Sequence, residues 1–152
     1  MCNGIFKSIS IKLFLHVLLA FNIFVIAAAH ADVNVEKAWV QLAPPNAKVY
    51  AAYLQLQNPS DAPLVIQSIT STCCARVAFH RTRVEKNKAV MEHLDDLTIP
   101  ANGKVVMKPG ALHIMLMDVA SPITLDDEIE LVLHFSGGEQ QTLRVPVIGY
   151  GQ

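Results

Sequence analysis

The segment ALHIMLMD, residues 111–118, carries side chains whose types and spacing could bind a metal ion. If this segment is a β-strand, successive side chains point to opposite faces of the sheet. Its three aliphatic residues would then face a core. His113, Met115 and Met117 would form a row of one imidazole and two thioethers on the opposite face.

Most of the remaining methionines and histidines lie close to this segment. The chain after residue 31 has four methionines, all within 27 residues: Met91, Met107, Met115 and Met117. Methionine commonly fills gaps in a hydrophobic core, and we expect this of Met107, which follows two valines. His80 and His93 lie on either side of Met91 in the sequence.

The runs RVAFHRTRV and AVMEHL, separated by polar residues, predict a β-hairpin. A turn centred on Glu85 and Lys86 would place His80 opposite Met91, and Ala78 opposite His93. Directly opposite residues share a face, with Cβ atoms about 5 Å apart. If this patch adjoins His113 and Met115, two imidazoles and two thioethers converge from three strands.

Such a donor set favours one kind of metal. Thioether sulfur is soft and neutral, and soft sulfur ligands select Cu(I). A structural zinc site would need thiolates or histidines at closed tetrahedral spacing, which this sequence lacks. A solvent-exposed site on rigid strands would let a partner protein reach the ion.

The elements that must position these residues are predicted to be strands. Eight to ten short β-rich runs alternate with turn signals containing Pro, Gly, Asn and Asp, without an internal repeat. This pattern is typical of an all-β sandwich or barrel. Residues 32–152 are long enough to form a single such domain.

The first 31 residues are predicted to be a secretory signal peptide. Lys7 and Lys12 precede a long apolar run that ends in the small-residue site Ala29-His30-Ala31. An uncleaved membrane anchor is the alternative, because the run approaches the length of a bilayer span. Cys2 precedes the apolar run instead of ending it, which disfavours a lipoprotein.

Charge and catalytic motifs limit the possible functions. All 13 acidic residues but only ten of the 12 basic ones follow residue 31, which gives residues 32–152 a formal charge of −3. This charge offers no basic surface for nucleic acid. No catalytic nucleophile, phosphate loop or carboxylate pair stands out, so we do not expect an enzyme.

The spacing His80, ten residues, Met91, 21 residues, His113, one residue, Met115 resembles the H-x10-M-x21-H-x-M motif of the PCuAC periplasmic copper chaperones. The surrounding AWV, AAYLQLQN, KPGALHIML and VPV segments are also similar to that family. The resemblance implies a cupredoxin-like Greek-key β-sandwich that binds Cu(I) at these four residues. It further implies a periplasmic monomer that delivers copper to the CuA subunit of cytochrome c oxidase or to a Sco-type thiol protein.

Some residues fall outside this motif. His93 is an additional imidazole that could be a fifth or alternative ligand, and Met117 could shield the site or simply pack. Cys73 and Cys74 are adjacent, and we expect them at a strand end with one thiol inward and one outward. His134 is expected on a strand surface.

Three other functions remain as alternatives. A blue-copper electron carrier needs a cysteine thiolate with two histidines, but both cysteines precede every candidate ligand. An exported interaction module could use the Met/His patch for docking. Thiol-redox activity is disfavoured because redox motifs usually separate their cysteines by two residues.

Overall fold

Alternation of apolar and polar residues makes strands of most of the domain. A computed structural model describes residues 32–149, which form ten strands joined by turns and contain no helix. Accordingly, no described residue belongs to a helix with the length and hydropathy needed to cross a bilayer. The predicted leader, residues 1–31, lies outside the described residues, so its cleavage stays a prediction.

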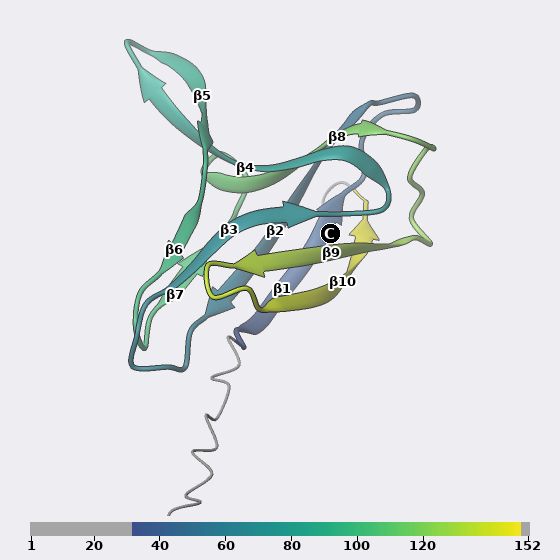
Figure 1. Ribbon diagram of the computed structural model, residues 1–152. Coiled ribbons are helices and arrows are strands. Elements are labelled where there is room, and N and C mark those ends of the chain that lie inside the picture. The colour runs from purple at the N-terminus through teal and green to yellow at the C-terminus, as the bar shows by residue number, and fades with distance from the viewer. Residues whose placement is uncertain (1–31, 150–152) are drawn as a thin grey trace, which may run out of the picture.

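The strands follow one another along the chain with short connections (Figure 1). They are β1 (Asn34–Gln41), β2 (Val49–Gln57), β3 (Leu64–Thr70), β4 (Cys74–Glu85), β5 (Lys88–Leu94), β6 (Leu97–Ile99), β7 (Lys104–Val106), β8 (Leu112–Val119), β9 (Glu128–Phe135) and β10 (Gln140–Ile148).

The strands form the two layers of a β-sandwich. One layer has the order β5-β4-β8-β2-β1, with the short β7 also paired to β2, and the other has the order β10-β9-β3-β6. A short parallel pairing between β1 and β10 joins the two layers at one side. The β4–β5 hairpin projects beyond the sandwich (Figure 1). The predicted all-β sandwich is therefore confirmed.

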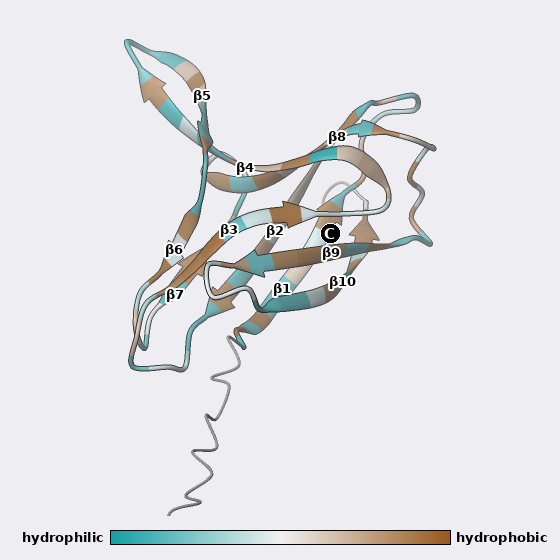
Figure 2. Ribbon diagram, viewed as in Figure 1, coloured by the Kyte–Doolittle hydropathy of each residue, from teal (hydrophilic) through white to brown (hydrophobic). Residues whose placement is uncertain are grey.

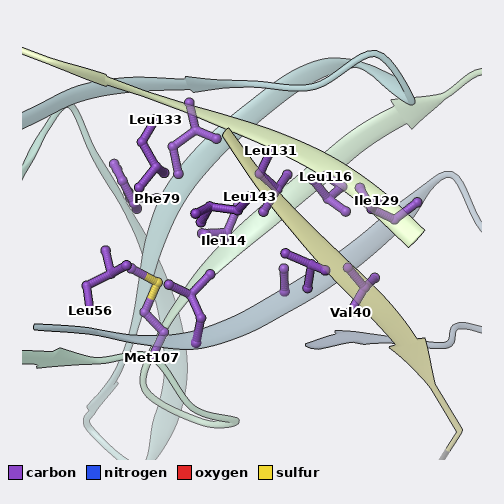
Figure 3. Packing of buried hydrophobic residues seen from close by; sticks show 14 of the residues in the cluster. Val40, Leu56, Phe79, Met107, Ile114, Leu116, Ile129, Leu131, Leu133 and Leu143 are labelled. Atoms are coloured by element: carbon purple, nitrogen blue, oxygen red, sulfur yellow. The ribbon is translucent and has the colours of Figure 1, made fainter. Parts of the chain in front are cut away.

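The core lies between the layers and receives every second residue of the central strands. Hydrophobic and hydrophilic residues alternate along the strands (Figure 2). Phe79 of β4 and Ile114 of β8 point into the core with Leu131 and Leu133 of β9 (Figure 3), and all four are fully buried. Met107 is also buried, as its sequence context predicted. Because Phe79 and Ile114 are anchored inward, their neighbours His80 and His113 must point outward.

A buried amide fixes the loop that follows β2. Asn58 is fully buried, and its Nδ2 donates to the carbonyl oxygens of Ala62, Ile99 and Pro100 at 2.8, 3.3 and 3.1 Å. Its Oδ1 accepts from the backbone and hydroxyl of Ser60 at 2.9 and 2.7 Å. These bonds compensate for the desolvation of the amide, which is costly without partners.

Candidate metal centre

His113 has a fixed ring orientation on strand β8. A turn containing Gly110, whose φ of 75° suits glycine, leads into the strand at Ala111, whose carbonyl also accepts from the backbone N–H of Thr82. That carbonyl lies 2.9 Å from Nδ1 of His113, so Nδ1 carries the proton and donates to it. The second ring nitrogen, Nε2, therefore keeps its lone pair, which is the tautomer a metal-binding histidine needs. Only 6% of His113 is exposed.

His80 lies directly opposite His113 on the neighbouring strand β4. The two imidazole rings are stacked, with centroids 6.1 Å apart and an angle of 25° between their planes. Burial lowers the pKa of His80, and the nearby His93 and His113 lower it further, although the backbone of Ala78 partly opposes this. Nδ1 of His80 is buried without a well-formed hydrogen bond. His80 is therefore held in the neutral form that binds a metal.

The hairpin register differs from the sequence prediction by two residues. The turn is centred on Lys86 and Asn87, both with positive φ (48° and 62°), because a two-residue hairpin turn of type I′ needs such values and asparagine tolerates them. His80 consequently faces His93, and Met91 faces Thr82. The predicted pairing of His80 with Met91 was wrong. A shift of two residues nevertheless keeps Met91 and His93 on the face of His80.

The two thioethers lie on either side of the histidine row. Met91 is two residue pairs beyond His80 in the direction of the hairpin tip, and Met115 is two residue pairs beyond His113 in the opposite direction, facing Ala78. Met91, His113 and Met115 line one cavity of about 450 Å³ together with Thr82. The four predicted ligands thus share one face on three adjacent strands, although His80 itself lines the neighbouring cavity.

The donor types at this face limit what it can hold. No three His, Cys, Asp or Glu side chains within residues 32–149 are grouped closely enough to hold a metal ion. The thioethers of Met91 and Met115 are the soft donors on the same face as His80 and His113. His93, in contact with His80 at a ring distance of 5.2 Å, lies 3.6 Å from the carboxylate of Asp95.

Two aromatic residues that the sequence reasoning missed continue the row of rings. Tyr53 of β2 lies 6.4 Å from the ring of His113, and Trp39 of β1 lies 5.3 Å from Tyr53. A β-bulge between Glu36 and Trp39, with Lys37 at a φ of 49°, turns Trp39 from the core face to this face. The sequence gives no clear signal for that bulge. Tyr53, by contrast, could have been placed on this face from the alternation of side chains along its strand.

The residues outside the motif occupy different environments. Met117 lines the second cavity, of about 550 Å³, with Cys74 and His80, and not the cavity that contains Met115. Both cysteines are half-buried at the start of β4, and the expected inward and outward split of their thiols stays a prediction. Burial raises the pKa of Cys74 to about 12, and hydrogen bonding to Cys73 adds to this. His134 lies on the surface of β9, where it shares a 2.8 Å hydrogen bond with Thr70, as expected.

Comparison of the sequence with known proteins identifies relatives described as lipoproteins. A family model described as "Putative lipoprotein LpqE-like" matches residues 33–147. The curated "Putative lipoprotein Lxx21020" of Leifsonia xyli subsp. xyli is 32% identical over 117 residues, which cover 76% of this chain and 69% of that protein. Both descriptions name lipoproteins, whereas Cys2 of this chain lies ahead of its apolar run.

Solved structures show the same fold. The copper-bound PCuAC domain from PmoF2 superposes with a TM-score of 0.66 at 21% identity, covering 80% of this chain and 96% of that domain. The solution structure of CuI-DR1885 from Deinococcus radiodurans has a TM-score of 0.66 at 25% identity, covering 84% and 85%. The expected cupredoxin-like sandwich and the likeness to PCuAC domains are thereby confirmed. The chain belongs to the LpqE-like family, with the fold of PCuAC domains.

Proposed function

We propose that this protein is an exported metallochaperone that binds Cu(I) through His80, Met91, His113 and Met115. In this role it hands copper to a respiratory oxidase assembly pathway, with the oxidase CuA subunit or a Sco-type thiol protein as acceptor. The CuI-DR1885 structure and the copper-bound PmoF2 domain support copper as the cargo. The lipoprotein descriptions of the relatives support export.

The observation that carries the proposal is the orientation of His113. Its Nδ1–H is held by the Ala111 carbonyl, so Nε2 is available on the face that also presents His80 and two thioethers. All four donors are uncharged when they bind, which suits a monovalent soft ion. Their positions on paired strands reduce the ordering cost at binding.

The exposure of the site suits transfer to another protein. Met91 is 55% exposed and lies on the projecting β4–β5 hairpin, whereas His113 is buried against the sheet. An acceptor could therefore reach the copper from the Met91 side, replacing the exposed thioether before the buried imidazole. Ligand-by-ligand replacement avoids release of free Cu(I) into solvent.

The test compares two sets of methionine variants. Met91→Leu/Met115→Leu removes both thioether sulfurs at nearly constant volume, and Met107→Leu makes the same change in the core. Both changes are made in a Cys73→Ser/Cys74→Ser background, so that the thiols do not compete for the ion. In an anaerobic Cu(I) titration against a coloured chelator, the protein with Met91→Leu/Met115→Leu should bind at least about tenfold more weakly, or 1.4 kcal/mol. The Met107→Leu control should bind as the unaltered protein does.

The result that contradicts the proposal is equal Cu(I) binding by the double variant and the control. The exposed Met/His face would then be better explained as a docking surface of an exported interaction module. Intense visible colour on loading with Cu(II) would instead point to a blue-copper carrier with a thiolate ligand.

A further inference from the structure

The two adjacent cysteines lie at the start of β4, away from the four-residue site. Their Sγ atoms are 3.4 Å apart, well beyond the roughly 2.05 Å of a disulfide bond. The hydroxyl of Ser71 lies 3.3 Å from Sγ of Cys73. Since thiolate–metal bonds are about 2.3 Å long in zinc sites, two sulfurs at this separation can bind one ion without rearrangement of the backbone.

A third sulfur lies beside this pair. Cys74 faces Val119 of β8, and Met117 lies two residues before Val119 on the same strand, opposite Arg76. Such diagonal neighbours on one face are within reach of long side chains, and the backbone of Met117 hydrogen-bonds the thiol of Cys74. Met117 and Cys74 also line the same cavity. Cys74 and Met117 therefore meet at a solvent-connected cavity, and the thiol of Cys73 lies 3.4 Å from that of Cys74.

This sulfur cluster is separate from the four-residue site. Six residues of extended strand separate Cys74 from His80, which corresponds to about 20 Å at roughly 3.3 Å per residue. Both residues line the same cavity, but at that distance they cannot bind one ion. The arrangement consequently excludes a blue-copper centre that combines Cys74 with His80 and His93.

We propose that Cys73, Cys74 and Met117 form a second Cu(I) site. Soft thiolate and thioether sulfur select Cu(I) over harder ions. Binding converts the two thiols to thiolates, and their protons pass to solvent while the oxidation state of copper is unchanged. This site is independent of the proposed oxidase pathway and adds a second ion to the cargo of the chain.

A thiol-redox role explains the same pair less well. Thiol–disulfide exchange needs a thiolate nucleophile, and burial of Cys74 keeps its thiol protonated. A metal ion overcomes this obstacle because a coordinating thiol is deprotonated by the ion itself. Strand β8 also links the two sites, since Met115 belongs to the first and Met117 to the second, two residues apart on one face.

The test counts copper ions and thiols in the purified, reduced protein. The unaltered protein should bind two Cu(I) per chain, and Cys73→Ser/Cys74→Ser should bind one. Met91→Leu/Met115→Leu should also bind one, with thiolate-to-Cu(I) charge-transfer absorption in the near ultraviolet. In that variant Cu(I) should protect both thiols from alkylation, as counted by intact mass. Met117→Leu should weaken this protection while leaving both cysteines intact.

Equal alkylation of the two thiols with and without Cu(I), in the unaltered protein and in Met91→Leu/Met115→Leu, would overturn the second site. This measurement does not depend on the folding of the serine variant. Failure of the first site has a different signature, since Cys73→Ser/Cys74→Ser would bind no copper while the thiols of the unaltered protein stayed protected.

Discussion

The number of histidine ligands should be readable from the pH dependence of Cu(I) binding. Each imidazole must be neutral to bind, so below its pKa each ligand histidine weakens binding about tenfold per pH unit, or about 1.4 kcal/mol. With both His80 and His113 as ligands, the Cu(I) affinity should fall by about a hundredfold per pH unit once the pH is below both pKa values. The pKa of His80 is lowered from 6.5 by burial and by its histidine neighbours. The ring of His80 therefore stays neutral to a lower pH, and its contribution to the loss of Cu(I) affinity begins only below pH 6.5.

The assay is an anaerobic competition titration in the Cys73→Ser/Cys74→Ser background, which removes proton release from thiols. Circular dichroism at each pH confirms that the protein is folded. His80→Ala in this background should reduce the limiting loss to about tenfold per pH unit. His93→Asn is the matched control on the neighbouring strand and should leave the hundredfold limit unchanged.

Two results would refute the two-histidine set. His93 would be a third ligand if the Cu(I) affinity fell by nearly a thousandfold per pH unit and His93→Asn reduced that dependence. Binding that does not change with pH would exclude imidazole ligands altogether and leave sulfur as the only donor.

Three further outcomes follow from the structure. Asn58→Ala should lower the free energy of unfolding in urea by about 2–3 kcal/mol, because it leaves the buried carbonyl of Ile99 without its donor and removes the bonds to Ala62, Pro100 and Ser60; unchanged stability would contradict the role assigned to this amide. Without copper, the urea midpoint should fall as the pH drops below 6.5, because unfolded His80 accepts a proton that the folded ring resists; His80→Gln should flatten this profile. Copper loading should alter the fluorescence of Trp39, the single tryptophan, through its contact with Tyr53 beside His113, and Met91→Leu/Met115→Leu should abolish the change.

Period-two patterning in the sequence determined the strands and their faces. In LHIMLM the aliphatic residues had to enter a core, so His113 and Met115 had to share the opposite face. The face assignment was also correct for the β4–β5 hairpin, although the predicted register was wrong. Moving the turn to Lys86 and Asn87 exchanged the partner of His80 without changing the side of the sheet, since a two-residue shift preserves parity.

Long-range pairing and local backbone irregularities were decided only in the tertiary structure. The sequence does not specify that β4 lies between β5 and β8, and this order alone brings His80 beside His113 and Met117 near Cys74. The bulge at Lys37 turns Trp39 outward, and the carbonyl of Ala111 selects the tautomer of His113. A period-two pattern describes one strand at a time, whereas a metal site depends on which strands pair and in which register, which is set by packing of the whole core.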